Sequence, residues 1–204
     1  MSKMIEIRWH GRGGQGAKTA ALLFADACLG AGMYIQAFPE YGPERTGAPV
    51  ASYNRISGEP ITIHSAVESP SVVVILDPTL IGAVDVMKGL PQDGVVLVNT
   101  NETTEEMGKK LGLNGQKLFV LDASTISKET IGRDIPNTPM LGALVEQVKD
   151  MSKAIFNSHA PPFGYALDLR PELTADLMQA ADRKIHVGSS AVTHMIEKYY
   201  PLLG

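Results

Sequence analysis

Short apolar segments alternate with helical patterns along most of this 204-residue chain. Residues 4–10 alternate between apolar and polar side chains, as a strand with one buried face does. Residues 71–77, 95–99 and 117–121 are instead continuous apolar runs, which are typical of strands covered on both faces. Further strands are expected at 33–38, 50–56 and 60–64.

Apolar residues at helical spacing separate these strands. They predict helices at 17–29, 80–88 and 104–111, a helix that carries Leu141, Leu144, Val145 and Val148, and two helices in the tail at 171–183 and 189–200. The stripe from Leu141 to Val148 is either core or the wall of a cofactor site, and we favour core. The order of elements predicts an α/β protein: a single Rossmann-like layered domain over residues 1–204, with a mixed, largely parallel sheet and C-terminal helices.

The turn between the first strand and the first helix is rich in glycine. Gly11, Gly13 and Gly16 fit the pattern G-x-G-x-x-G, with a strand before it and a helix after it. Glycine lets the backbone approach an anion closely, and the first amides of a helix have no partner within the helix. The turn therefore predicts a phosphate-binding site, although the pattern alone has low specificity.

Further groups must contribute, because an anion at a helix terminus gains about 1–2 kcal/mol whereas micromolar binding requires about 8 kcal/mol. Arg12, Gln15 and Lys18 lie near the turn, and Arg45 belongs to a second loop that can fold over it. Each of these residues alone is also explained by a solvated surface position. As a set around a glycine turn, they favour ligand contact.

The second loop, residues 38–49, is long for a connection in an α/β domain. Three prolines restrict its backbone, and Glu40, Glu44 and Arg45 can form charge-assisted hydrogen bonds. We interpret the loop as ordered and functional. The alternative is a rigid edge loop whose Glu44 and Arg45 face solvent.

Polar residues follow two of the apolar strands, at the sheet edge where ligands of open α/β sheets bind. These residues are Asp77 and Asn99. Asn137 and Thr138 lie at the start of the helix that carries Leu141 and raise the same question. Each of the four can belong to a site or can cap the helix that follows.

Three of these segments resemble the gamma subunits of the 2-oxoacid:ferredoxin oxidoreductases, in particular those of pyruvate:ferredoxin oxidoreductase (pyruvate synthase). The resemblance rests on G-R-G-G-Q-G at 11–16, F-P-E-Y-G-P-E-R-T-G-A-P at 38–49 and P-N-T-P-M-L-G-A at 136–143. The order and separation of the three motifs fit as well. One position departs, because this chain has Thr46 where the family often has a second arginine.

The resemblance implies a multisubunit enzyme that converts a 2-oxoacid, coenzyme A and oxidised ferredoxin into acyl-coenzyme A, carbon dioxide and reduced ferredoxin, or runs the reverse reaction. Alpha, beta and delta subunits would hold thiamine diphosphate, Mg²⁺ and iron–sulfur clusters. This chain would add the domain that receives coenzyme A and would be inactive alone. The implied coenzyme A contacts are Gly11, Arg12, Gly13, Gly14, Gln15, Gly16, Lys18, Arg45, Asn137 and Thr138, with no catalytic residue and no metal ligand.

The cysteine and histidine content fits this division of labour. An iron–sulfur cluster requires about four thiolates, and the chain has one cysteine, Cys28, which we expect to be a small buried apolar residue. The five histidines lack metal-binding spacing, and for His10, beside the glycine turn, a structural role is favoured over a site role. Neither G-x-S-x-G nor a glycine turn ending in G-K-[ST] occurs, so a hydrolase elbow and a Walker P-loop are unsupported.

The net charge of −4 gives no general attraction to nucleic acid, so any recognition of anions must be local. No apolar run approaches the roughly 20 residues of a membrane span, and the N-terminal residues include no apolar signal region. We therefore expect a cytoplasmic protein without nucleic-acid or membrane partners.

Two other functions stay open. A stand-alone NAD- or FAD-binding oxidoreductase would use the same glycines and an acidic residue at the end of the second strand, where this chain has Gln36; Glu40 comes late, after Pro39. An assembly subunit with a vestigial glycine turn would bind no ligand. The 2-oxoacid is not identifiable from this chain, since its pocket would lie mostly on partner subunits.

Overall fold

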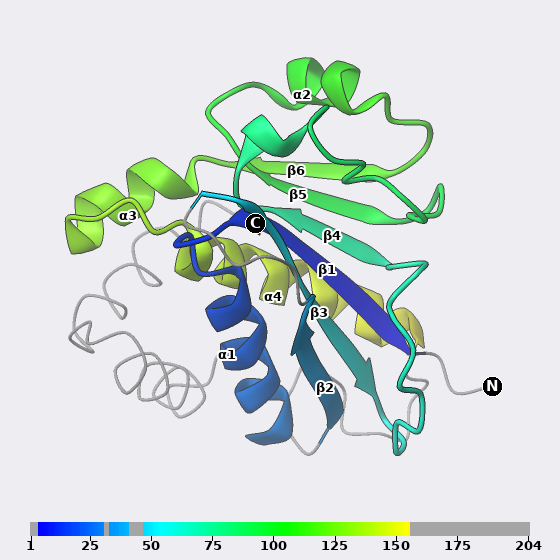
Figure 1. Cartoon of the computed structure of the whole chain (residues 1–204). Helices are drawn as coiled ribbons and strands as arrows, with labels where there is room; N and C mark the ends of the chain where they lie inside the picture. Colours follow the sequence, from blue (N-terminus) through cyan, green and yellow to red (C-terminus); the bar gives the residue numbers. More distant parts are fainter. Residues whose placement is uncertain (1–3, 31–32, 41–46, 156–204) are drawn as a thin grey trace.

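A computed structural model describes residues 4–30, 33–40 and 47–155. Within these ranges, one sheet has helices on both of its faces (Figure 1). Its strands are β1 (Ile5–Arg12), β2 (Tyr34–Pro39), β3 (Pro49–Ser57), β4 (Val72–Ile75), β5 (Val95–Asn99) and β6 (Lys117–Leu121). The helices are α1 (Ala17–Gly30), α2 (Thr104–Leu111), α3 (Ala123–Ile131) and α4 (Asn137–Ile155), with a 3₁₀ turn, η1 (Pro78–Leu80).

The strands follow the order β2-β3-β1-β4-β5-β6. β3 pairs antiparallel with both β1 and β2, whereas β1, β4, β5 and β6 form a parallel run. Trp9 of β1 lies opposite Ser52 of β3 and Val74 of β4. The expected mixed, largely parallel α/β sheet is confirmed. Because β1 and β4 are parallel neighbours, their carboxyl ends meet at one edge of the sheet.

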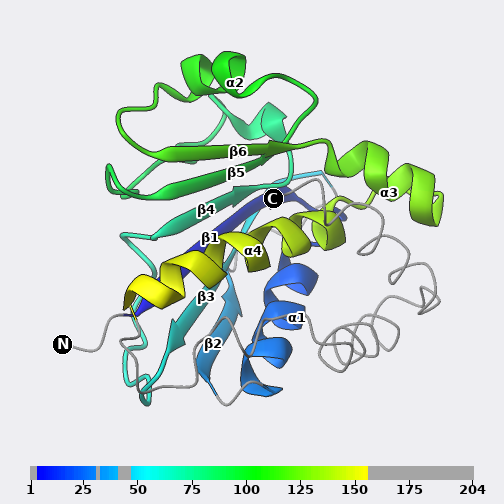
Figure 2. The ribbon, with the colours of Figure 1, turned by 180° about the vertical axis from the view of Figure 1, so that it is seen from behind.

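Two apolar layers enclose the sheet. α1 and α4 cover one face, as the view from behind shows (Figure 2), and Trp9 and Leu144 both belong to the core of this layer. Cys28 is buried in the same layer, as expected. Side chains alternate across a strand, so Ile75 of β4 faces the other layer, where Met107 of α2 completes a second core.

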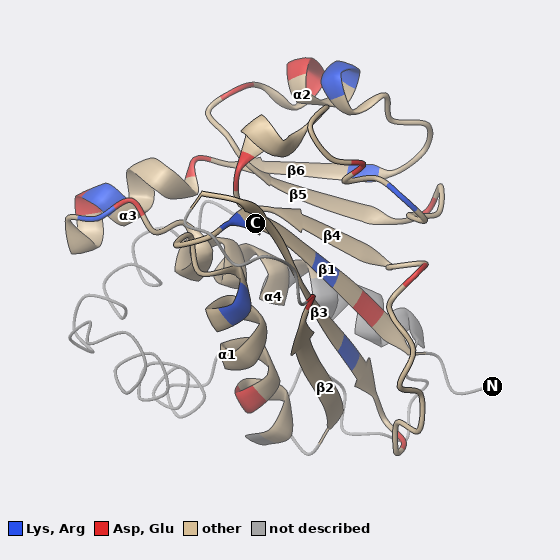
Figure 3. Cartoon of the chain, viewed as in Figure 1, with Lys and Arg blue, Asp and Glu red and all other residues tan. Residues whose placement is uncertain are grey.

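The half of the sheet formed by β2, β3 and β1 also carries buried polar groups. Figure 3 shows charged residues on β1 and β3 and none on β4 and β5. On the face covered by α1, Trp9 Nε1–H donates to Asn54 Oδ1 at 2.8 Å, and Asn54 Nδ2–H donates to the Ala21 carbonyl at 2.9 Å. These two bonds tie β1, β3 and α1 together.

The structure corrects three expectations. Residues 60–64 form no strand, because the Ile63 carbonyl accepts hydrogen bonds from the side chains of Gln36 and Arg55 instead of a neighbouring strand. Residues 80–88 are not a helix: after η1 the chain continues in turns, with Gly82 at a φ of 87°. Helix α3 was not expected.

The two tail helices expected at 171–183 and 189–200 lie outside the described residues, as does the side chain of Val148. Leu141, Leu144 and Val145 of the expected stripe are buried against the sheet, which confirms their core role. In the part of the chain that the structure describes, none of the helices combines the length and the apolar character needed to span a bilayer.

Candidate functional site

The glycine turn joins β1 to α1 at the carboxyl edge of the sheet. Gly14 and Gly16 have φ values of 101° and 83°, in the left-handed region that favours glycine. The first helical hydrogen bond of α1 runs from the Ala20 amide to the Gly16 carbonyl at 2.8 Å, so the amides of residues 17–19 precede the helical ladder. The amides of Gly14 and Gly16 likewise have no acceptor among the described residues. The turn thus presents several unpaired N–H donors.

Asn137, the first residue of α4, packs against Gly16. A Cβ at position 16 would lie 2.4 Å from Asn137 Nδ2, so no side chain fits there without a shift. Asn137 Nδ2–H donates to the Gly16 carbonyl at 3.5 Å, and Thr138 Oγ1–H donates to Asn137 Oδ1 at 3.3 Å. The structure therefore brings Asn137 to the glycine turn, whereas Thr138 bonds to Asn137 and has no direct contact with the turn among the hydrogen bonds of the described residues. Asn137 is buried and supports the backbone of the turn.

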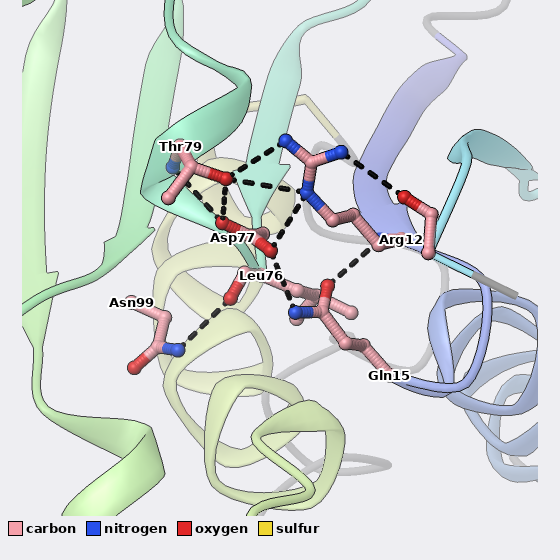
Figure 4. A network of polar contacts seen from close by, with 7 residues as sticks. Arg12, Gln15, Leu76, Asp77, Thr79 and Asn99 are labelled. Carbon is pink, nitrogen blue, oxygen red and sulfur yellow. Dashed lines mark hydrogen bonds and ion pairs between the residues drawn. The ribbon is translucent and has the colours of Figure 1, made fainter.

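Asp77, just after β4, holds the glycine turn through a polar network (Figure 4). Its Oδ2 accepts a hydrogen bond from Gln15 Nε2 at 2.8 Å and lies 3.2 Å from Arg12 Nε. Its Oδ1 accepts from the Thr79 amide at 2.9 Å and the Thr79 hydroxyl at 2.6 Å. Burial opposes ionisation of Asp77, but the hydrogen bonds from Thr79 and Gln15 and the charge of Arg12 outweigh it and hold the pKa of Asp77 below its ordinary value.

Arg12 and Gln15 stabilise the glycine turn through hydrogen bonds to other groups of the protein. Arg12 Nη1 donates to the Gly47 carbonyl at 3.0 Å and Arg12 Nη2 to Thr79 Oγ1 at 2.9 Å, while Gln15 Oε1 accepts from the Arg12 amide at 2.7 Å. The sequence indicated both side chains as ligand contacts, and the structure shows that both already have protein partners. The Arg12 side chain nevertheless keeps 30% of its surface exposed.

Sequence reasoning left Asp77 open between cap and site, and it missed Thr79. The structure shows that Asp77 caps η1 and also binds the glycine turn. A signal for Thr79 was present, because Asp-Pro-Thr after an apolar strand is typical of a turn in which the Asp side chain accepts the amide two residues on.

The second loop meets the glycine turn at its C-terminal end. The Gly13 amide donates to the Ala48 carbonyl at 3.0 Å, and the Gly47 amide donates to the Gly13 carbonyl at 3.2 Å. The amide of Gly13 is therefore occupied. Arg45 and Thr46 lie outside the described residues, so the contact expected from Arg45 stays a prediction.

A groove of about 430 Å³ lies between the glycine turn, the first turn of α1 and the ends of β2 and β3. Gly13, Gly14 and Gly16 line it together with Lys18 and Glu40. Lys18 is exposed and has no ion-pair partner among the described residues. Arg12 lines the groove as well, so the groove combines backbone donors, two cationic residues and one carboxylate. Its size falls in the ordinary range of small-ligand sites.

Asn99, the other polar strand end, has a structural role. Its Nδ2–H donates to the Leu76 carbonyl at 2.9 Å, and its Oδ1 accepts from the Ser124 amide at 3.1 Å. The side chain therefore joins β5 to the end of β4 and to the start of α3. Thr103, and not Asn99, caps α2.

His10 is a buried structural residue, as favoured from the sequence. Its Nε2 accepts a hydrogen bond from Arg8 Nε at 3.0 Å. Burial, and then the charge of Arg8, lower the pKa of His10 to about 4, so the imidazole is neutral near pH 7. Among residues 4–30, 33–40 and 47–155, no three His, Cys, Asp or Glu side chains are grouped so that they can hold a metal ion.

These features define a class of protein: an α/β domain with an anion-binding glycine turn at the carboxyl edge of a mixed sheet. Residues 6–159 match the family model for pyruvate ferredoxin/flavodoxin oxidoreductase. The chain belongs to this family, as one of its gamma-type subunits.

Named relatives support the assignment. The pyruvate synthase subunit PorC of Thermotoga maritima is 57% identical over 143 residues, which cover 70% of this chain and 73% of the relative. The common subunit gamma of the pyruvate/ketoisovalerate oxidoreductases of Pyrococcus furiosus is 45% identical over 166 residues, which cover 79% of this chain and 90% of the relative.

Two solved structures share the fold. The crystal structure of the Thermotoga maritima pyruvate oxidoreductase subunit PORC aligns with a TM-score of 0.62 at 44% identity, over 84% of this chain and 96% of that chain. The 2-oxoglutarate:ferredoxin oxidoreductase of Magnetococcus marinus, solved with 2-oxoglutarate, coenzyme A and succinyl-CoA bound, aligns at 15% identity with a TM-score of 0.64. It covers 100% of this chain and 31% of the larger chain, and at this identity it shows the fold alone.

Proposed function

We propose that this gamma subunit receives coenzyme A in a 2-oxoacid:ferredoxin oxidoreductase, with the diphosphate of coenzyme A at the glycine turn. The observation that carries the proposal is the groove lined by Gly14, Gly16, the first turn of α1 and Lys18, where the amides of Gly14 and Gly16 have no acceptor among the described residues. Unpaired amides and a cation are the groups that bind phosphate at the start of a helix.

The hydrogen bonds within the turn determine which of its groups we propose as ligand donors. The amide of Gly13 binds Ala48, and the amide of Gln15 donates to the Arg12 carbonyl at 3.0 Å. The phosphate donors proposed here are therefore Gly14, Gly16 and the first helical amides. Arg12, Gln15 and Asn137 fix the shape of the turn, and the partly exposed Arg12 adds positive charge to it.

We place the remaining chemistry on partner subunits in the cytoplasm: alpha, beta and delta subunits with thiamine diphosphate, Mg²⁺ and the clusters that reduce ferredoxin. One cysteine in the whole chain does not supply the four thiolates that a cluster requires. This chain binds and orients the acyl acceptor, and we expect no 2-oxoacid oxidation by the chain alone. The direction of the reaction and the identity of the 2-oxoacid depend on the partners.

The test is Gly14→Asp in the assembled enzyme. A carboxylate beside the phosphate site should raise the coenzyme A KM at least tenfold, about 1.4 kcal/mol, while thiamine-dependent decarboxylation of pyruvate persists. No atom lies within 4 Å of a Cβ at position 14, so only backbone strain and the new charge are added. Gly112→Asp is the matched control, because Gly112 also has a positive φ and open space and ends α2 outside the groove.

A Gly14→Asp enzyme with an unchanged coenzyme A KM would overturn this placement. An assembly subunit without a ligand would give that result. Specific binding of NAD or FAD at the groove, with no effect of the variant on coenzyme A, would instead support the stand-alone dinucleotide-binding oxidoreductase.

A further inference from the structure

Glu40 places a carboxylate in a groove that otherwise suits anions. The residue follows β2 directly, and its amide donates to the Ala51 carbonyl at 2.9 Å. Glu40 is one of the residues that line the groove, together with Gly14 and Gly16, and Lys18 lines it from α1. A carboxylate repels phosphate, so a site for bare phosphate does not explain its presence.

The Glu40 carboxylate is held in one position by a buried tyrosine. Tyr53 Oη–H donates to Glu40 Oε2 at 2.6 Å, and the Tyr53 ring stacks on Phe38 with centroids 5.4 Å apart. Burial, together with the hydrogen bond to Glu40, raises the pKa of Tyr53 to about 12, so the hydroxyl keeps its proton. Arg8, buried behind this pair, adds positive charge near both side chains.

Among the described residues, Glu40 Oε1 has no hydrogen-bond partner. An ionised carboxylate only accepts hydrogen bonds, so it selects an O–H or N–H donor. In α/β dinucleotide-binding domains, an acid after the second strand accepts such a bond from a ribose hydroxyl.

The structure also changes which residue occupies that position. By residue count Gln36 stood there, but its Nε2–H donates to the Ile63 carbonyl at 3.0 Å and its Oε1 accepts from Arg55 at 3.3 Å. Both polar atoms of the Gln36 side chain thus already have protein partners. β2 extends to Pro39, which puts Glu40 at its carboxyl end and in the groove.

We propose that Glu40 accepts a hydrogen bond from an O–H or N–H donor on the nucleoside of the ligand, so that the groove recognises an adenosine nucleotide and not phosphate alone. The two walls of the groove then divide the work: Lys18 and the glycine amides bind the phosphates, and Glu40 binds the nucleoside. This inference rests on the proposed function.

The experiment compares two competitors of coenzyme A in the assembled enzyme: adenosine 3′,5′-bisphosphate and inorganic diphosphate, with Mg²⁺ in excess. In Glu40→Ala, the inhibition constant of adenosine 3′,5′-bisphosphate and the KM of coenzyme A should rise about tenfold, because a hydrogen bond to a charged acceptor is lost. The inhibition constant of diphosphate should stay unchanged or fall, because a repelling charge is gone.

Three variants sharpen the comparison. Glu40→Gln keeps a carbonyl acceptor and should raise the KM of coenzyme A only about threefold, and Tyr53→Phe, which frees the carboxylate, should have a similarly small effect. Lys18→Ala, on the opposite wall, should weaken both competitors. Native mass spectrometry of the Glu40→Ala enzyme, beside the wild type, checks that the subunits are still assembled.

Equal changes for both competitors in Glu40→Ala would mean that Glu40 only supports the groove and would overturn the inference. So would no change for either, or no competition between adenosine 3′,5′-bisphosphate and coenzyme A. Gly14→Asp separates the two proposals. If it raises the coenzyme A KM while Glu40→Ala does not, the nucleoside contact alone is wrong; if neither variant changes that KM, the proposed function fails too.

Discussion

The two halves of the sheet solve the same packing problem with different chemistry. In the half formed by β4, β5 and β6, both faces of the central strands are apolar, and Val73, Val74 and Ile75 are fully buried. In the half formed by β2, β3 and β1, the face covered by α1 is largely apolar, but the other face buries Arg8 and Arg55. The first half has a structural role. The second half contains Tyr53, which bonds to Glu40 of the groove.

Arg55 shows how the polar half is kept together. Its side chain is 2% exposed, lies 2.7 Å from Glu6 Oε1 and donates to the Ser65 carbonyl at 2.6 Å. The guanidinium also lies 5.3 Å from the centroid of the Phe38 ring. α2 covers the apolar half. The polar half is instead covered by the segment after β3, which these bonds hold in place. Buried ion pairs of this kind add little net stability, but breaking one leaves a charge without its partner.

The largest expected effect on stability comes from replacing one buried charge of the polar half, Arg55, with an apolar side chain. Arg55→Met should lower the free energy of unfolding of the purified chain by about 4 kcal/mol, because Glu6 and the Ser65 carbonyl lose their donors. Urea denaturation at pH 7 measures the loss.

The control is Glu6→Gln, alone and together with Arg55→Met. Because both substitutions remove the same ion pair, the double variant should lose at least 1 kcal/mol less than the two single losses predict by addition. Additive losses would show that the pair is not coupled and that the two halves differ less than proposed here.

The second effect is a pH dependence confined to the polar half. His10 has a folded pKa of about 4, below its ordinary value near 6.5, so the unfolded chain binds the proton more readily between these values. The stability that His10 contributes is complete above pH 6.5 and falls as the pH drops towards 4, by about 3 kcal/mol in all. His10→Gln should flatten this part of the profile, as measured by urea denaturation at pH 7, 6 and 5.

Leu97→Ala is the matched variant in the apolar half. Leu97 of β5 is buried, and its truncation should cost about 3 kcal/mol by the same amount at each pH, since no charge changes. If the wild type and His10→Gln lose stability in parallel on acidification, the imidazole is not the responsible group.

The sequence predicted several elements of the apolar half closely, although the helix expected at 80–88 is wrong. Residues 95–99 and 117–121 are strands, and 104–111 is a helix, with the bounds expected. Continuous apolar runs and a Thr103-x-x-Glu106 capping box are local signals, so no distant partner is needed to interpret them. α3 was missed because Thr125, Ile126, Thr130 and Ile131 are β-branched and disfavour a helix, which Asp122 nevertheless caps.

The site depends on contacts that no local pattern contains. The glycine turn and its helix followed from the sequence, but the partners of Arg12 and Gln15 are Asp77 and Thr79, more than sixty residues away. The insertion of β3 between β2 and β1 is a pairing over long sequence distance as well. This pairing brings Tyr53 beside Glu40, the carboxylate of the groove.

The smallest expected effect on stability concerns α2, the helix that covers the apolar half. α2 starts with a capping box in which the Thr103 hydroxyl accepts from the Glu106 amide at 3.3 Å and the Glu106 carboxylate accepts from the Thr103 amide at 3.0 Å. Thr103→Ala should lower the free energy of unfolding by about 1 kcal/mol, and Thr103→Ser should keep most of it, because serine retains the capping oxygen. α2 packs against β6, which three strands separate from β3 and Arg55, so the loss should add to that of Arg55→Met. A coupling between the two variants in urea denaturation would show that the halves of the sheet are not energetically separate.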